Sequence, residues 1–227
     1  MVKTCGIIGG MSWESSAEYY KIINEEISKK LGSLHSGKII LYSVDFEEIA
    51  LKQKEGDWKG SAEILSDAAV SLQKAGADFV LIATNTMHKV AAEVKNSISI
   101  PLLDIRDATA EAIKNHGVKN VLLLGTKFTM EDDFYISYLR SKDLNVTVPD
   151  EAHRELIHKV IFDELCLGIT KDESKKAFLN IINSYDVEGV ILGCTEIGLL
   201  VSQKDLNIKV FDTTLIHAKA AVEKMLS

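Results

Sequence analysis

The stretch that decides the fold is VLIATNT at Val80–Thr86, an apolar run that stops at a hydroxyl side chain and continues into hydrogen-bonding residues. The same arrangement returns as VILGCTE at Val190–Glu196. Each stretch predicts a buried strand followed by the opening of a helix. Ligands of parallel sheets bind beyond the carboxyl ends of the strands, so Thr84 and Cys194 are expected at equivalent points of two similar halves. If these halves face each other, the two side chains stand on opposite sides of one small ligand.

Other segments repeat at nearly the same offset. Val2–Gly9 resembles Val118–Gly125, and Leu102–Asp104 resembles Val210–Asp212. Each second copy follows the first by about 110 residues, which is the signature of an internally repeated fold with small insertions.

Short apolar runs alternate with segments of helical period along the whole chain, the pattern of β-α units in a parallel sheet. We therefore predict an α/β protein of two pseudo-symmetric flavodoxin-like halves with the active site at their interface. The first half is expected to comprise residues 1–104 plus 213–227, and the second residues 105–212. Strands are predicted near residues 3–9, 39–44, 79–83, 101–103, 120–125, 144–148, 188–193 and 209–211. Helices are predicted at residues 15–31, 59–75, 86–96, 106–116, 131–142, 153–166, 172–184 and 213–226.

Composition narrows the class of protein. The 227 residues are 46% hydrophobic, enough for a sizeable core, and the net charge of −7 comes without a basic cluster. A nucleic-acid or anionic-membrane partner is therefore not expected. The beginning of the chain does not read as a signal peptide, and nowhere do about 18 apolar residues run together. We expect a soluble cytoplasmic protein whose partners are small molecules or copies of itself.

The cysteines point to a reducing compartment rather than to a disulfide framework, because they number three and are widely spaced. Cys5, inside an apolar strand, and Cys166, late in a predicted helix, are interpreted as core residues. The run Gly6–Gly10 lacks the G-x-G-x-x-G spacing of dinucleotide sites, and the histidines lack ligand spacing. Neither a nucleotide nor a metal site is expected.

Four ordered motifs carry a resemblance to a known family: Gly9–Ser15, Thr84–His88, Leu124–Met130 and Gly193–Glu196. Together they resemble the cofactor-independent aspartate/glutamate racemase family, over residues 2 to about 226. The subgroup described as L-aspartate/glutamate-specific racemase is similar in having threonine where most members have their first catalytic cysteine. The resemblance implies an isomerase that moves the Cα proton of an amino acid without pyridoxal phosphate or metal. It also implies a homodimer.

The two implied catalytic groups, Thr84 and Cys194, are chemically unequal. A thiol has a pKa near 8.5 and can be brought to thiolate by its neighbours, whereas an aliphatic hydroxyl is closer to water, with a pKa of about 15.7. The gap of roughly 7 units corresponds to about 10 kcal/mol. Cys194 is therefore predicted to be the base, and Thr84 to be a proton donor or a relay to an assisting group or water.

Further site residues are expected from the resemblance and from hydrogen-bonding capacity. Backbone N–H groups after Thr84 and Cys194 would hold the substrate α-carboxylate as enolate charge grows. Glu196 is assigned either to the substrate ammonium or to orienting the Cys194 proton. The resemblance places Met11 and Gln53 in the wall of the substrate pocket and Thr126 and Thr129 in the facing wall. The side chains of Asn85, Thr86 and Thr195 are expected to supply further hydrogen-bond donors.

Two departures from the family pattern keep other functions open. Family members that act on acidic substrates commonly carry an Arg after the second strand and a Lys in a second-domain helix, where this chain reads Val44–Glu47 and Glu164–Leu167. A wider set of amino acid substrates is therefore an alternative. A second alternative is a decarboxylase of the same superfamily, which keeps only the second cysteine. A third is an amino acid sensor that has kept the cleft and lost turnover.

Overall fold

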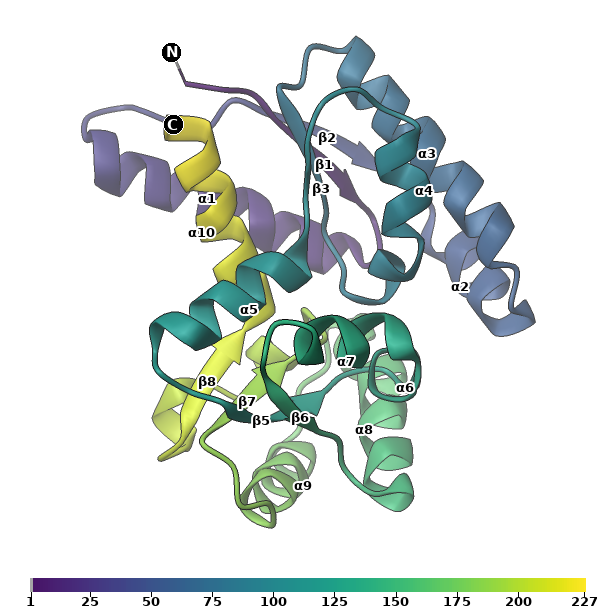
Figure 1. Ribbon diagram of the computed structural model, residues 1–227, viewed down its shortest axis with the longest axis vertical. Coiled ribbons are helices and arrows are strands. Elements are labelled where there is room, and N and C mark those ends of the chain that lie inside the picture. Colours follow the sequence, from purple (N-terminus) through teal and green to yellow (C-terminus); the bar gives the residue numbers. More distant parts are fainter. Residues whose placement is uncertain (1) are drawn as a thin grey trace. The chain divides into compact units, whose positions relative to one another are not determined.

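The computed structural model describes residues 2–227, which form two compact units (Figure 1). The first unit contains residues 2–105 and His217–Ser227, and the second contains Arg106–Ile216. The functional domain boundaries expected from the sequence, 1–104 plus 213–227 and 105–212, stay a prediction.

The first unit is built on a parallel four-stranded sheet in the order β2-β1-β3-β4. Its strands are β1 (Cys5–Gly9), β2 (Ile39–Ser43), β3 (Phe79–Ile82) and β4 (Leu102–Leu103). One hydrophobic cluster packs residues of the sheet with helix α3, and the other packs them with α1 and α10. The helices are α1 (Trp13–Leu31), α2 (Phe46–Glu55), α3 (Trp58–Lys74), the 3-10 helix η1 (Thr86–Val90), α4 (Ala91–Asn96) and α10 (Thr213–Leu226).

The second unit repeats this plan with the strand order β6-β5-β7-β8, again all parallel. Its strands are β5 (Asn120–Leu124), β6 (Asn145–Thr147), β7 (Gly189–Leu192) and β8 (Lys209–Asp212). The predicted α/β class with two parallel sheets is therefore confirmed. Its helices are α5 (Ile105–Asn115), α6 (Lys127–Glu131), α7 (Asp133–Arg140), α8 (Glu151–Asp163), α9 (Asp172–Asn183) and the 3-10 helices η2 (Leu165–Leu167), η3 (Ile197–Leu199) and η4 (Gln203–Asp205).

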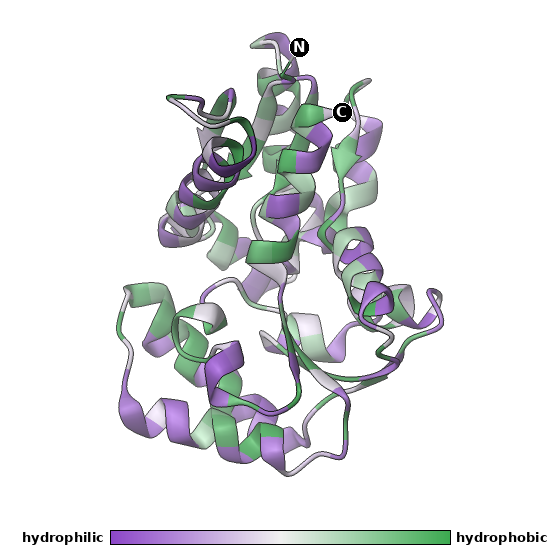
Figure 2. Cartoon of the chain, turned by 90° about the vertical axis from the view of Figure 1, so that its left-hand side faces the viewer, coloured by the Kyte–Doolittle hydropathy of each residue, from purple (hydrophilic) through white to green (hydrophobic). Residues whose placement is uncertain are grey.

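The helices are amphipathic, and Figure 2 shows hydrophilic and hydrophobic residues alternating along them. This pattern locates the long helices, but short ones differ from the prediction. Helix α2 was not predicted, although Asp45 caps it by accepting from the Glu47 N–H and Gly56 ends it in the left-handed conformation. The predicted helix 131–142 corresponds to α7, whereas the short α6 before it was not predicted, and the extended backbone of Asp132 separates the two.

A buried histidine ties the last helix to the first sheet. His217 on α10 contacts the Tyr19 hydroxyl through Nδ1 at 2.9 Å and the Leu103 carbonyl through Nε2 at 3.0 Å. Because a carbonyl only accepts, Nε2 carries the proton and Nδ1 accepts from Tyr19. Burial, reinforced by the neighbouring His88, lowers the pKa of His217 to about 3. The ring is therefore neutral at physiological pH.

This histidine predicts a loss of stability in acid. An unfolded histidine has a pKa near 6.5, so between that value and about 3 the unfolded chain binds a proton that the folded chain does not. The free energy of unfolding then falls as the pH falls, by about 1.4 kcal/mol per pH unit. Between pH 7 and pH 5 the wild type should lose about 2 kcal/mol more than a His217→Gln variant.

Urea unfolding at the two pH values measures this difference. A His35→Gln variant is the matched control, because it makes the same substitution at an exposed histidine and leaves His217 in place. Identical pH profiles for His217→Gln and the wild type would contradict the prediction.

Candidate active site

Thr84 lies just beyond the carboxyl end of β3, beside β1. The Ala83 N–H bonds to the Ile8 carbonyl at 2.9 Å and extends the strand pairing by one residue, so Thr84 is the first residue past the sheet. The chain leaves β1 towards β2 on one side and enters β3 on the other, which makes the gap between β1 and β3 the switch point of the sheet. Sheets of this kind bind ligands at that point. Thr84 is half-buried there.

His88 fixes the backbone of Thr84. Its Nε2 accepts from the Ile105 N–H at 3.1 Å, so the proton is on Nδ1, which donates to the Thr84 carbonyl at 2.8 Å. The ring is buried and stands edge-on to His217, with 6.1 Å between centroids. The spacing of four residues from Thr84 is the sequence signal for this contact, and the contact gives His88 a structural role.

The loop after β1 is tied to the same place. The Ser15 hydroxyl donates to the Ala83 carbonyl at 3.2 Å, and Ser12 caps α1 by accepting from the Ser15 N–H. Sequence reasoning did not single out Ser15; its signal was the Ser-x-x-Ser spacing of Ser12 and Ser15, which begins two residues after Gly10. These bonds join the exits of β1 and β3, so the ends of both strands are held together.

The other first-unit residues predicted for the site come from the same carboxyl edge. Met11 follows β1 and is buried in the hydrophobic cluster that also contains Met87. Gln53 is buried on α2, and its Nε2 donates to the Met87 sulfur at 3.0 Å. Asn85 and Thr86 are buried where η1 begins. The structure thus gathers these residues on the exits of β1, β2 and β3.

Cys194 holds the corresponding place in the second unit. The Gly193 N–H bonds to the Leu124 carbonyl at 2.6 Å, so Cys194 is the first residue past β7. A side chain on Gly193 would put its Cβ 2.7 Å from the Leu124 carbonyl oxygen, and therefore only glycine fits. On the neighbouring exit, Thr126 caps α6 by accepting from the Thr129 N–H.

Glu196 gathers two hydrogen bonds beside this cysteine. The Cys194 thiol donates to Oε2 of Glu196 at 3.0 Å, and the Thr195 hydroxyl donates to the same oxygen at 2.8 Å. Burial, followed by the negative charge of Glu196 and by Cys166, raises the pKa of Cys194 well above its usual range. Cys194 is therefore a thiol at neutral pH, and its S–H is directed at the Glu196 carboxylate. This geometry favours the second of the two roles expected for Glu196.

The other two cysteines lie in different surroundings. Cys5 is fully buried in β1, where burial raises its pKa to about 12. Cys166 is half-buried in η2 and packs against the second-unit core, as its assignment to the core requires. All three are free of disulfides. Only Cys194 stands at a strand exit.

The helices expected after the two motifs are shorter than predicted. η1 and η3 are single 3-10 segments of five and three residues, and α4 begins only at Ala91. The Cys194 carbonyl accepts from the Ile197 N–H at 3.1 Å, a local turn rather than a helical ladder. Neither the Thr84 motif nor the Cys194 motif therefore opens a long helix with a large dipole, and anion binding there depends on individual N–H and O–H donors.

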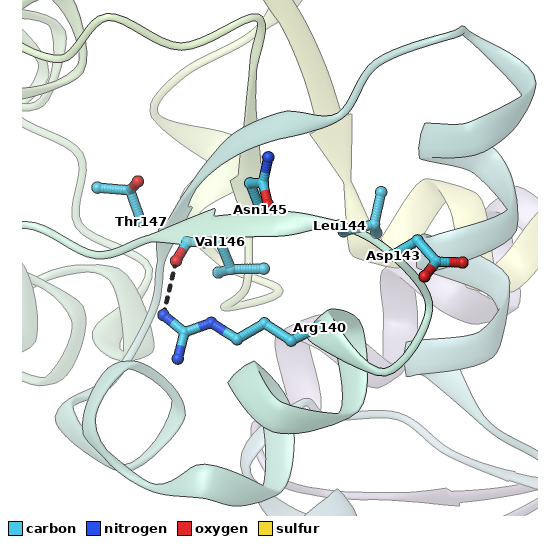
Figure 3. A pocket seen from close by; sticks show the side chains of 6 residues that line it. All are labelled: Arg140, Asp143, Leu144, Asn145, Val146 and Thr147. Carbon is cyan, nitrogen blue, oxygen red and sulfur yellow. Dashed lines mark hydrogen bonds between the residues drawn. The ribbon is translucent and has the colours of Figure 1, made fainter.

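An open pocket lies on the edge of the second sheet, away from the predicted residues (Figure 3). It is lined by Arg140, Asp143, Leu144, Asn145, Val146 and Thr147. In Figure 3 the Arg140 side chain reaches β6, where Nη2 donates to the Val146 carbonyl at 3.1 Å. Within residues 2–227 no set of three or more His, Cys, Asp or Glu side chains is arranged to hold a metal ion. No helix in the same range is long and apolar enough to cross a bilayer.

Comparison with known proteins gives one consistent result. The family model described as Asp/Glu/Hydantoin racemase matches residues 8–221. A curated relative, the broad specificity amino-acid racemase RacX of Bacillus subtilis, is 25% identical over 98% of both chains. A crystal structure of a putative Asp/Glu racemase from Yersinia pestis is 48% identical over 99% of this chain and 100% of that one, with a TM-score of 0.91. An aspartate racemase homologue from Pyrococcus horikoshii is 40% identical over the same shares, with a TM-score of 0.86.

Proposed function

The chain belongs to the Asp/Glu/Hydantoin racemase family, and from this premise we propose that it interconverts the L- and D-enantiomers of an amino acid by removing and returning the Cα proton. The observation that carries the proposal is the extent of the match. It runs through residues 8–221 and so includes both strand-exit motifs, one with Thr84 and one with Cys194. Aspartate and glutamate are the first candidate substrates.

In the proposed reaction Cys194 acts on one face of the Cα and Thr84 on the other. The contact between the Cys194 thiol and Glu196 supports a first step in which the thiol proton passes to the carboxylate. The resulting thiolate takes the Cα proton, and the electron pair of the C–H bond moves into the α-carboxylate as an enolate. The Thr84 side then supplies a proton to the opposite face, which completes the inversion.

The enolate requires donors, because an amino acid Cα–H is a very weak acid. Backbone N–H groups after Thr84 and Cys194 are proposed to hold it, together with the side chains of Asn85, Thr86 and Thr195. Met11, Gln53, Thr126 and Thr129 are proposed to line the substrate. Enantiomers have equal free energy, so the equilibrium ratio is unity although the two directions use unequal groups.

A broader substrate range is the second candidate, and the two departures from the family pattern favour it. Asp45 caps α2, and the Glu164 carboxylate is held by Lys171 at 3.1 Å and by the Ser174 hydroxyl at 2.7 Å. Neither stretch offers a cation to a substrate side-chain carboxylate. The curated relative carries the name of a broad specificity amino-acid racemase, which agrees with this alternative.

Deuterium incorporation at Cα in heavy water tests the function. Purified protein without pyridoxal phosphate is incubated with single L- and D-amino acids, and mass spectrometry and chiral chromatography follow exchange and inversion. We expect both, first with aspartate or glutamate, ending at equal amounts of the two enantiomers. Tight binding by calorimetry without exchange would favour the sensor, and carbon dioxide release from a malonate-type acid would favour the decarboxylase.

We further propose that the protein acts in the cytoplasm as a homodimer. Support for the compartment comes from the free thiols, since an active-site thiol requires reducing conditions.

A further inference from the structure

The outer edge of β2 presents backbone N–H and C=O groups that pair with no other strand of the sheet. β2 is the edge strand of the first sheet, and its residues alternately direct their backbone N–H and C=O groups towards β1 and away from it. The Cys5 N–H bonds to the Lys38 carbonyl at 2.9 Å, and the Val44 N–H bonds to the Gly9 carbonyl at 3.0 Å, so even-numbered residues face β1. The backbone groups of Ile39, Leu41 and Ser43 therefore point away from the sheet.

The remaining sheet edges are protected or very short. β4 has two residues. On β6 the Arg140 guanidinium covers the outward Val146 carbonyl, and on β8 the Gln203 side chain accepts from the outward Val210 N–H at 3.0 Å. β2 is longer than these strands, with five residues, and its sequence Ile-Ile-Leu-Tyr-Ser contains no charge and no proline. Proteins normally block a free edge with such residues, so an unblocked one marks a site for strand pairing.

Exposed apolar side chains surround this edge. Leu41 lies on the α1 face of the sheet, where its Cδ1 is within 2.8 Å of the position that a Cβ on Gly9 would occupy, beside Ser16. Trp13 and Tyr20 are one turn before and one turn after Ser16 on α1. The exposed fractions are 68% for Trp13, 56% for Tyr20 and 45% for Leu41. A Trp and a Tyr exposed on the same face of a helix and beside an exposed Leu are typical of a protein interface rather than of free surface.

The charges along β2 are arranged for self-pairing. Lys38 precedes the strand, whereas Asp45, Glu47 and Glu48 follow it. If a second copy of β2 lies antiparallel with Leu41 opposite Leu41, then Lys38 lies opposite Val44 of that copy, next to Asp45. The basic end of each strand thus meets the acidic end of the other. A parallel arrangement would put like charges together.

We propose that two copies of this chain pair through β2, antiparallel, about a two-fold axis that passes through Leu41. The two first-unit sheets then form one continuous sheet, and Trp13 and Tyr20 pack at its seam. This interface is isologous, as expected for a two-fold dimer. The proposal goes beyond the racemase activity and does not depend on it.

Cysteine cross-linking tests the register. Residue 41 is opposite itself in a hydrogen-bonded pair, with a Cα–Cα separation of about 5.5 Å, which a disulfide can span. Leu41→Cys should therefore cross-link with oxidised glutathione. Ser43→Cys is the matched control: it lies on the same outward edge, but its counterpart in the second copy is roughly 13 Å away. The wild type reports any cross-linking by the natural cysteines.

Light scattering with size-exclusion chromatography tests the dimer itself. We expect twice the chain mass of 25.0 kDa for the wild type and 25.0 kDa for Leu41→Lys, with an unchanged circular dichroism spectrum. A monomeric wild type would overturn the proposal, as would a Leu41→Lys dimer or equal cross-linking of Leu41→Cys and Ser43→Cys. Deuterium exchange at Cα is measured separately, so failure of the interface is distinguishable from failure of the activity.

Discussion

Cys194→Ala is expected to lower Cα deuterium incorporation by about 10²- to 10⁴-fold, the usual worth of a general base, for both enantiomers of the substrate. The loss affects both directions because the remaining group, Thr84, is a far weaker base. Its hydroxyl lies roughly 7 pKa units above a thiol, equivalent to about 10 kcal/mol. The measurement is mass-spectrometric exchange in heavy water at saturating substrate.

Cys166→Ala is the matched control for this prediction. Cys166 is the other half-buried thiol of the second unit and packs against the same core, but it is not at a strand exit. Its removal leaves Cys194 and Glu196 in place and takes away only a lesser contribution to the raised pKa of Cys194, so exchange should remain close to wild type. If Cys194→Ala exchanged at the wild-type rate, the racemase mechanism proposed for this chain would be wrong.

The same site predicts how the rate of the wild type depends on pH. Because burial and Glu196 raise the pKa of Cys194, the free thiolate is a minor species at neutral pH. In the proposed step the thiol proton passes to Glu196 and stays in the site, so kcat/KM should change little through the neutral range. In Glu196→Gln the amide still accepts a hydrogen bond but takes up no proton at neutral pH. Proton transfer from Cys194 is then slower, and kcat should fall more than KM changes.

The strand-exit motifs were predictable because two patterns agreed. An apolar run bounded by small polar residues marks a buried strand, and the repeat at about 110 residues requires the same strand order in both halves. The structure has that order, β2-β1-β3-β4 and β6-β5-β7-β8. Thr84 and Cys194 follow β3 and β7, the corresponding strands, so their equivalence within the two units needed no tertiary information.

The details that the sequence left open depend on contacts between distant residues. Two roles remained for Glu196, and only the hydrogen bond from the Cys194 thiol favours one of them. The helices after the motifs were overestimated because apolar spacing does not distinguish a 3-10 turn from an α-helix. Helix α2 was missed because its hydrophobic face is interrupted by lysines and glutamates, although its cap at Asp45 and its stop at Gly56 were readable. That Thr84 and Cys194 meet at one substrate stays a prediction.

Thr84→Val is expected to abolish most inversion of configuration while deuterium exchange at Cα continues for one enantiomer. Valine keeps the shape and branching of threonine but has no hydroxyl, so the opposite face of the Cα loses its proton source. Inversion should fall by about 10²- to 10⁴-fold. Cys194 is still present and can remove a proton from the one enantiomer that presents its Cα–H to the thiolate. After exchange with solvent, the deuterium returns to the same face.

Thr84→Val should therefore label one enantiomer with retention of configuration and leave the other unlabelled. Chiral chromatography combined with mass spectrometry distinguishes this result from a general loss of activity, in which neither enantiomer would be labelled. Thr84→Ser keeps the hydroxyl and should keep inversion. Thr84→Cys supplies a second thiol, which should retain activity and bring the rates of the two directions closer together. The hydrogen bond from His88 to the carbonyl of residue 84 does not involve the side chain of that residue, so it survives Thr84→Val and keeps the backbone in place. Full inversion by Thr84→Val would therefore show that a group other than the Thr84 hydroxyl protonates that face.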